Sequence, residues 1–296
     1  MWNAILLSLV TAIYYVLLRR MSTADSPFLL GTAFRVVCLL LFSTFFTIRG
    51  RWRQLLSKQV RELLPWLLLI ASCNFLLESA TIIGLRLTTA LNAALLSRVD
   101  IVFAIAIGAT FFSELPRKAD LWGIALLTSG SLAVLNVHLG SISSHVVGDL
   151  LIVGAGLLIA FNAFVIRFKL ASLENEVIAF HNVLYSTIPF AIAACWETRF
   201  FSFAATNFAL VGILGLVTFG NYVIYYAALR CMPVWRIRTL LLAVPALVLF
   251  AGVLFLRDPL TIGQLVGAIL VLLGELVVLI SAKNRALETV PVASTG

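Results

Sequence analysis

The chain has 296 residues, an apolar fraction of 62%, a mean hydropathy of +1.09 and only 11% charged residues. Roughly a quarter of the residues of a soluble domain are charged, so the composition excludes an ordinary soluble fold and indicates a surface that faces lipid. The formal charge of +8 does not indicate nucleic-acid binding, because the basic residues lie mainly in short segments between apolar runs, a pattern typical of membrane proteins.

Ten apolar stretches are long enough to cross a bilayer as helices, which takes roughly 20 residues. The predicted spans are Trp2–Leu18, Pro27–Ile48, Leu63–Ile83, Thr88–Phe112, Ala119–Leu139, Gly148–Ile166, Glu176–Trp196, Thr206–Leu229, Pro233–Leu256 and Thr261–Ala282. The one long polar connection, Arg49–Glu62, has the composition of a short helix on the membrane surface. The sequence therefore predicts an all-α integral membrane protein with ten transmembrane helices.

The basic residues predict the orientation of these spans. With a cytoplasmic amino terminus, five basic residues lie outside: Arg19, Arg20, Arg86, Arg199 and Arg257. Fourteen then lie in cytoplasmic segments: Arg49, Arg51, Arg53, Lys58, Arg61, Arg117, Lys118, Arg167, Lys169, Arg230, Arg236, Arg238, Lys283 and Arg285. Because cytoplasmic loops carry an excess of Lys and Arg, we expect both termini to be cytoplasmic, in a plasma membrane of the bacterial inner-membrane type.

An internal repeat relates the two halves of the chain at an offset of 144 residues. Leu85-Arg86 recurs as Leu229-Arg230, Glu114 corresponds to Asp258, and Gly123 and Gly130 correspond to Gly267 and Gly274. Five spans per repeat is an odd number, so the two copies must enter the membrane from opposite sides. The expected organisation is two inverted five-helix repeats, residues 1–140 and 145–285, followed by a flexible cytoplasmic tail at 286–296. Such inverted repeats are typical of secondary transporters.

The same motifs carry a resemblance to a known family. The second half contains Ala243-Val244-Pro245, Leu256-Arg257-Asp258 and Gln264-Leu265-Val266-Gly267, and the first half contains Thr88-Thr89-Ala90, Ala93-Ala94-Leu95-Leu96 and Phe112-Ser113-Glu114-Leu115. In this order and spacing, they resemble the EamA-like branch of the drug/metabolite transporter superfamily over nearly the whole chain. Ile101 departs from the pattern, because a proline is expected there. The resemblance implies a ten-helix secondary transporter, often an exporter of amino acids or other metabolites.

Ionisable groups at membrane depth are costly unless they are paired or hydrated, so each is a candidate functional residue. Asn74 and Glu78 lie four residues apart on one face of the third span. Arg98 and Asp100 lie near the middle of the fourth span and point about 200° apart. One interpretation pairs Arg98 with Glu78 and turns Asp100 toward a central cavity, and the reverse arrangement is equally open. Either carboxyl group could carry a coupled proton, because low dielectric favours its neutral form.

The second half supplies further polar candidates. Thr218 and Tyr222 lie on one side of the eighth span and correspond by the offset to Asn74 and Glu78; His181 lies in the seventh span. Such side chains suit a pocket for an amphipathic solute or hydrogen bonds between helices. Arg238 could anchor the ninth span or bind an anionic group. The predicted substrate and proton pathway is Asn74, Glu78, Asn92, Arg98, Asp100, His181, Thr218, Tyr222 and Arg238.

Enzyme motifs are missing from the sequence, among them HExxH, GxSxG and the phosphate-binding GxxxxGK[ST]. We therefore expect no enzyme activity, no cofactor and no metal, and partners limited to a small-molecule substrate, the lipid bilayer and, through the GxxxG spacing of Gly263 and Gly267, a second copy of the chain. The predicted function is export of a small organic metabolite by alternating access. The alternatives are exchange or import of an anionic or nucleotide-linked metabolite, and a receptor or assembly protein that transports nothing.

Overall fold

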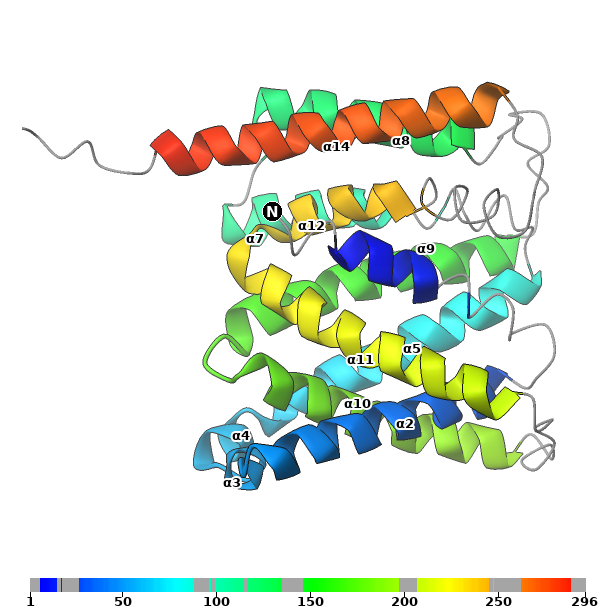
Figure 1. Cartoon of the computed structure of the whole chain (residues 1–296), viewed down its shortest axis with the longest axis vertical. Helices are drawn as coiled ribbons and strands as arrows, with labels where there is room; N and C mark the ends of the chain where they lie inside the picture. Colours follow the sequence, from blue (N-terminus) through cyan, green and yellow to red (C-terminus); the bar gives the residue numbers. More distant parts are fainter. Residues whose placement is uncertain are drawn as a thin grey trace, which may run out of the picture.

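A computed structural model describes residues 6–14, 17, 27–87, 96, 99–113, 116–134, 146–196, 207–244, 247 and 262–288. All regular elements among them are helical (Figure 1). They are α2 (Pro27–Ile48), α3 (Trp52–Leu55), α4 (Lys58–Glu62), α5 (Leu64–Leu87), α7 (Asp100–Phe112), α8 (Lys118–Val134), α9 (Val146–Phe164), η2 (Val165–Lys169), α10 (Asn175–Trp196), α11 (Asn207–Cys231), α12 (Val234–Leu240), η3 (Leu241–Ala243) and α14 (Ile262–Glu288). Several residues singled out above lie outside the described part, namely Asn92, Arg98, Glu114, Pro245 and Asp258.

Five helices of the described part are long and apolar enough to cross a membrane: Phe28–Ile48, Leu64–Gly84, Val146–Lys169, Asn175–Trp196 and Phe208–Cys231. They coincide with the second, third, sixth, seventh and eighth predicted spans, and the bounds of α2 are those predicted. Two shorter apolar helices, Asp100–Phe112 and Leu265–Val278, lie within the fourth and tenth predicted spans. The prediction of an all-helical membrane protein is confirmed.

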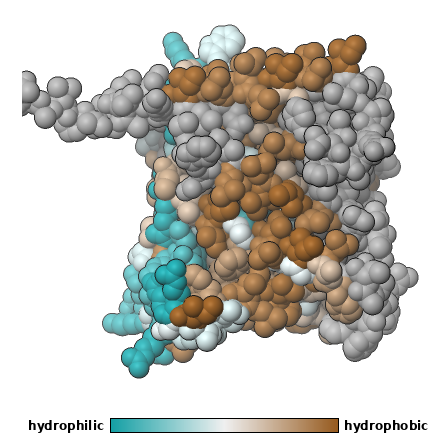
Figure 2. All heavy atoms as spheres, in the orientation of Figure 1, coloured by the Kyte–Doolittle hydropathy of each residue, from teal (hydrophilic) through white to brown (hydrophobic). Residues whose placement is uncertain are grey.

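The surface has the polarity that a bilayer requires. Figure 2 shows hydrophobic side chains over the length of the bundle and hydrophilic ones gathered at one end, where α3 and α4 lie in Figure 1. Large apolar side chains are exposed on the helices, among them Leu40, Phe111 and Ile192. Because lipid tails surround such side chains without a penalty, this exposure identifies the lipid-facing surface.

The polar connection after α2, for which one short surface helix was predicted, forms two short helices, α3 and α4. The Ser57 side chain accepts a hydrogen bond from the Val60 backbone N–H at 3.3 Å, which caps the first turn of α4. Leu55 and Val60 are buried against the bundle, whereas Leu56 is exposed. This segment therefore lies over one end of the bundle.

The largest buried cluster joins helices from both halves of the chain. Phe42 of α2 and Ile70 of α5 lie in it together with Ala163 of α9, Ile178 of α10 and Trp235 of α12. The two halves therefore share one hydrophobic core.

Helices α8 and α14 pack together through glycines that the repeat relates. A Cβ atom added to Gly130 would lie 2.7 Å from the Gly267 carbonyl oxygen, and one added to Gly274 would lie 2.9 Å from the Gly123 carbonyl oxygen. Since Gly123 meets Gly274 and Gly130 meets Gly267, the two helices run antiparallel. Gly267 is thus used inside the chain, whereas a Cβ on Gly263 would meet nothing within 4 Å.

Candidate functional site

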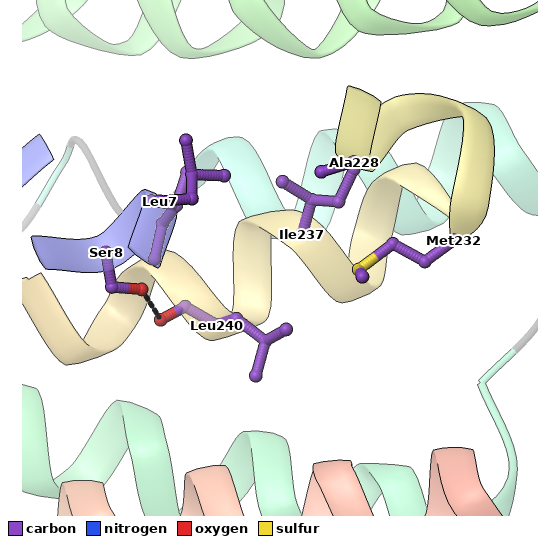
Figure 3. Close-up of a pocket in the computed structure, with 7 residues that line it drawn as sticks. Leu7, Ser8, Ala228, Met232, Ile237 and Leu240 are labelled. Atoms are coloured by element: carbon purple, nitrogen blue, oxygen red, sulfur yellow. Dashed lines mark hydrogen bonds between the residues drawn. The ribbon is translucent and has the colours of Figure 1, made fainter. Parts of the chain in front are cut away.

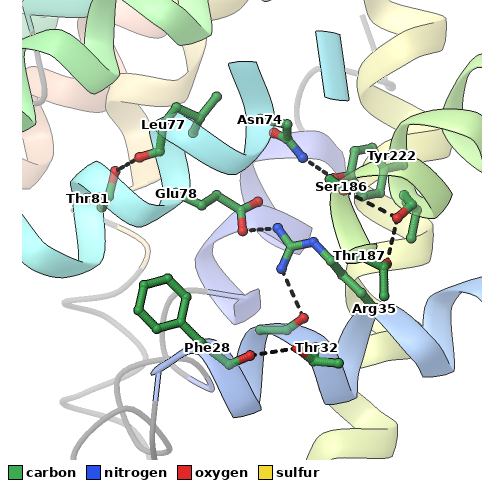
Figure 4. Close-up of polar contacts among 12 residues, drawn as sticks. Phe28, Thr32, Arg35, Asn74, Leu77, Glu78, Thr81, Ser186, Thr187 and Tyr222 are labelled. Carbon is green, nitrogen blue, oxygen red and sulfur yellow. Dashed lines mark hydrogen bonds and ion pairs between the residues drawn. The ribbon is translucent and has the colours of Figure 1, made fainter. Parts of the chain in front are cut away.

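A buried ion pair joins α2 to α5. Arg35 of α2 is fully buried, and its Nη2 donates a hydrogen bond to the Glu78 carboxylate of α5 (Figure 4). Its Nη1 donates to the Gly31 carbonyl oxygen at 2.9 Å. One of the two interpretations of the sequence paired Glu78 with Arg98, which lies outside the described residues. The partner that the structure shows is Arg35, because its long side chain reaches from α2 across to α5.

Aromatic rings enclose the Arg35 guanidinium. Its central carbon lies 4.0 Å from the ring centroid of Phe190 of α10 and 4.9 Å from that of Phe34. Gly31 permits this approach, because a Cβ at that position would lie 2.9 Å from the Phe190 ring. Cation–π contacts of a desolvated guanidinium are stabilising, so Arg35 is held tightly by its carboxylate, a carbonyl and two rings.

One turn before Glu78, Asn74 connects the first half of the chain to the second. Its Nδ2 donates a hydrogen bond to the Tyr222 hydroxyl of α11 at 2.9 Å (Figure 4). Asn74 is buried. Three predicted pathway residues, Asn74, Glu78 and Tyr222, are therefore brought together, with Arg35 as an addition to the set.

A second ion pair joins α7 to α12. Arg238 Nη1 lies 3.9 Å from Asp100 Oδ2, and the two side chains are 4% and 17% exposed. Asp100 is the first residue of α7, and Gly156 of α9 allows this helix start to come close, since a Cβ there would lie 3.4 Å from the Asp100 nitrogen. Gly156 is the eleventh of 19 residues in α9, about 15 Å from its start. This ion pair therefore lies near the middle of the bundle.

The remaining donors of Arg238 are only partly used. Its Nη2 donates to the Tyr225 hydroxyl and lies 3.4 Å from the Ile159 carbonyl oxygen. Its central carbon lies 5.1 Å from the Tyr225 ring centroid. The Nε group is buried and has no hydrogen-bond partner among the described residues. Because buried polar groups are nearly always paired, this N–H is available to a ligand.

Three tyrosines of α11 link the two ion pairs. The Tyr222 and Tyr226 ring centroids lie 5.7 Å apart, and those of Tyr225 and Tyr226 lie 5.9 Å apart. Asn182 Nδ2 of α10 donates to the Tyr226 hydroxyl at 2.6 Å. Sequence reasoning did not name Asn182 or Tyr226, because an apolar neighbourhood gives no sign of a hydrogen bond between distant positions. The three packed tyrosine rings therefore lie between the two ion pairs inside an apolar bundle.

Two predicted pathway residues make contacts within their own helices. His181 Nδ1 lies 2.8 Å from the Val177 carbonyl oxygen, and its ring centroid lies 5.7 Å from that of Tyr185. The Thr218 hydroxyl donates to the Leu214 carbonyl oxygen at 2.7 Å. These contacts do not link either residue to the two ion pairs.

Two recesses lined by described residues lack the space or the polar groups that a solute site needs. The recess at Leu7, Ser8, Ala228, Met232, Ile237, Leu240 and Leu241 leaves no room for a water molecule, and there Ser8 donates to the Leu240 carbonyl oxygen at 3.3 Å (Figure 3). The other, of about 480 Å³, is lined by Phe28, Phe75, Pro189, Ile192, Ala193 and Trp196. Apart from the indole N–H of Trp196, its lining offers no polar side chain to orient a solute.

Polar contacts link several segments at the end of the bundle that carries α3 and α4. Arg51 pairs with Glu174, which also accepts from Gln54 Nε2 at 3.1 Å. Arg230 donates to the carbonyl oxygens of Ala171 and Leu173. The Arg51–Glu174 contact therefore joins the two halves of the chain at this end of the bundle.

Comparison with known proteins identifies a family whose sequence profile matches this chain and a solved structure with a similar fold. The sequence profile of the EamA-like transporter family matches residues 1–136 and again 146–280. No curated protein matches the chain significantly. Among 29 matching chains of solved structures, one described only as "Crystal structure of protein" is 18% identical, with a TM-score of 0.79 over 96% of each chain. At that identity, the likeness concerns the fold alone.

Proposed function

Since this chain belongs to the EamA-like transporter family, matched in both halves, we propose that it is a secondary transporter that moves a small organic solute by alternating access. The family consists of membrane transporters and not enzymes, which confirms the prediction that the chain has no enzyme activity. The observation that supports the mechanism best is the polar path of Arg35, Glu78, Asp100 and Arg238 inside an apolar bundle. Buried charges of this kind mark substrate and ion pathways in membrane proteins.

The proposed architecture is ten spans in two inverted repeats, residues 1–140 and 145–285, with a tail at 286–296. The packing of α8 on α14 supports it, because the offset of 144 converts the Gly123–Gly274 contact into the Gly267–Gly130 contact. A two-fold axis that exchanges antiparallel neighbours lies perpendicular to them, which here means in the plane of the membrane. Inverted-repeat transporters have this symmetry.

The proposed orientation places the end with α3 and α4 in the cytoplasm of a bacterial-type cell, together with both termini. Arg49, Arg51, Arg53, Lys58 and Arg61 lie in or beside these short helices, and the last turn of α14 ends on the same side of the bundle in Figure 1. Such an excess of basic residues is typical of cytoplasmic loops.

Alternating access requires the cytoplasmic end to open and close. In this proposal the contacts of Arg51 and Gln54 with Glu174 hold the two halves together at the cytoplasmic end, so the described state would bind solute from the opposite side. Because exposed ion pairs contribute only about 0–1 kcal/mol, these contacts can separate in each cycle.

The proposed substrate is an amino acid or a related amphipathic organic solute, exported with coupling to protons at Asp100 or Glu78. The buried Arg238 favours a second candidate, uptake or exchange of an anionic metabolite. Both candidates share the path of tyrosines and charges, and they differ in the direction of flux and the charge of the solute.

Flux into proteoliposomes tests this proposal. Purified protein is reconstituted with a pH gradient, and uptake of labelled amino acids, organic anions and organic cations is compared with uptake by protein-free liposomes. We expect gradient-driven flux of at least one class. Flux that is unchanged in both Asp100→Asn and Glu78→Gln would refute proton coupling, and absence of flux for every class would favour a receptor or assembly role.

A further inference from the structure

The two buried ion pairs differ in how firmly they are closed. Arg35 bonds directly to Glu78 and is enclosed by Phe34 and Phe190. Arg238 and Asp100 approach only to 3.9 Å, which exceeds hydrogen-bond distance. The second pair is therefore held by charge attraction without a direct hydrogen bond, and a competing anion can replace its carboxylate.

We infer that Arg238 binds the carboxylate of the transported solute in place of Asp100, and that the displaced Asp100 takes up one proton from water. This inference rests on the proposed transport function and deepens its second candidate, uptake or exchange of an anionic metabolite, by naming the binding group and the coupling step. The incoming carboxylate accepts hydrogen bonds from the guanidinium, including the Nε–H that has no partner among the described residues. Tyr225, whose hydroxyl already accepts from Arg238, lies beside the same position.

Charge balance requires the proton. At rest, the positive charge of Arg238 and the negative charge of Asp100 cancel. The bound carboxylate of a solute that carries no cationic group would leave one excess negative charge in a medium of low dielectric, which is strongly unfavourable. Protonation of Asp100, in which a carboxylate oxygen gains a proton from the aqueous phase, restores neutrality. Each bound carboxylate thus brings about one proton with it.

Arg238 is a charged side chain that the structure places next to Asp100. Two helices make the main contacts with α7, namely α9 and α12. The second of these presents Arg238, and Tyr225 of α11 adds a phenol to the same cluster. Near this position α9 contributes Gly156 and Ile159, which do not titrate. On the chain just before α7, Arg98 lies outside the described residues.

Proton-linked binding in detergent tests the inference without any need for flux. Acetate and 3-phenylpropionate serve as carboxylate probes, 3-phenylpropionamide as the neutral analogue and inorganic phosphate as the competing anion. A pH indicator in weakly buffered solution measures protons taken up on binding. We expect about one proton for each bound carboxylate and none for the amide. Failure of both carboxylates to bind, or a preference for phosphate, would overturn the inference.

Variants assign the effect to the two residues. Asp100→Asn should bind 3-phenylpropionate without proton uptake, and Arg238→Gln should lose at least about tenfold in affinity, equivalent to one lost charged hydrogen bond. If the unpaired Asp100 prevents Arg238→Gln from folding, the double variant Arg238→Gln/Asp100→Asn removes both charges and should likewise fail to bind. Arg236→Gln is the matched control, because it removes a buried arginine two positions away on α12 and should retain binding and proton uptake.

The outcomes separate this inference from the proposed function. Proton-linked binding in detergent without flux in liposomes would refute transport and leave the assignment of Arg238 and Asp100 intact. Flux of carboxylates with no proton uptake on binding, or proton uptake that persists in Asp100→Asn, would refute the assignment and leave transport intact.

Discussion

The Asn74 side-chain amide donates a hydrogen bond to the Tyr222 hydroxyl at 2.9 Å, across the contact between α5 and α11. By the repeat offset, Asn74 corresponds to Thr218 and Glu78 to Tyr222, so the symmetric image of this contact would join Thr218 to Glu78. The structure shows other contacts for these two residues: the Thr218 hydroxyl donates to the Leu214 carbonyl oxygen, and Glu78 pairs with Arg35. The repeat thus supplies a symmetric scaffold on which the two halves carry different side chains.

Loss of the Tyr222 hydroxyl should destabilise the protein measurably. In Tyr222→Phe the buried Asn74 amide loses its acceptor, and we expect a decrease of about 1–3 kcal/mol in the free energy of unfolding. Denaturation in detergent, followed by circular dichroism, measures it. Tyr185→Phe is the control. The double variant Asn74→Leu/Tyr222→Phe should lose less than the sum of the single variants, and strict additivity would mean that the hydrogen bond contributes nothing.

Neutralisation of Glu78 should have a larger effect. Glu78→Gln leaves the guanidinium of Arg35, which is fully buried, without a counter-ion, and breaking such a pair costs about 3–5 kcal/mol. Replacing both partners, as in Arg35→Met/Glu78→Leu, should recover most of that loss, because apolar side chains are well tolerated in place of a complete buried pair. The same denaturation experiment measures both. A Glu78→Gln protein as stable as the wild type would show that the pair has no structural role.

Much of the fold follows from the sequence because lipid imposes a simple length rule. Apolar stretches of about 20 residues must form helices, and so α2 begins at Pro27 and ends at Ile48 as expected. A single short surface helix was predicted before α5 for a similar reason, since basic residues flank Leu55 and Leu56 there, and the structure divides that segment into α3 and α4. The packing of α8 on α14 was not predicted, although its glycines were noted. The repeat offset shows which positions of the two halves are equivalent, but it does not show which of them are in contact.

The site was harder to predict than the fold. Helical periodicity shows which side chains share one face of a helix, but it does not show which residues of another helix that face contacts. Asn74 and Glu78 were placed on one side of a helix, but nothing local to them pointed to Arg35, which lies 43 positions earlier in the chain. Arg238 was equally compatible with an anchor at the membrane surface. Its ion pair with Asp100 depends on α12 packing against α7, which is a tertiary contact that no local pattern encodes.

The glycine contact between α8 and α14 makes a prediction about packing. In Gly130→Ala the new Cβ would lie 2.7 Å from the Gly267 carbonyl oxygen and from the Val271 nitrogen. Both are backbone atoms, so the helices themselves must separate, and we expect a loss of about 1–3 kcal/mol in stability. Gly263→Ala is the matched control on α14, because its Cβ meets nothing within 4 Å. Equal melting temperatures for the two variants would contradict the close antiparallel packing.

Two exposed cysteines test the proposed orientation directly. Cys195 lies in the last turn of α10 and Cys231 ends α11, and Figure 1 shows these two helix ends at opposite ends of the bundle. A membrane-impermeant maleimide added to intact cells should label Cys195 and reach Cys231 only after permeabilisation. The other two cysteines, Cys38 and Cys73, are buried, so Cys195→Ser and Cys231→Ser identify each signal. Labelling of Cys231 alone in intact cells would place α3, α4 and both termini outside, because every later span alternates with the one before it.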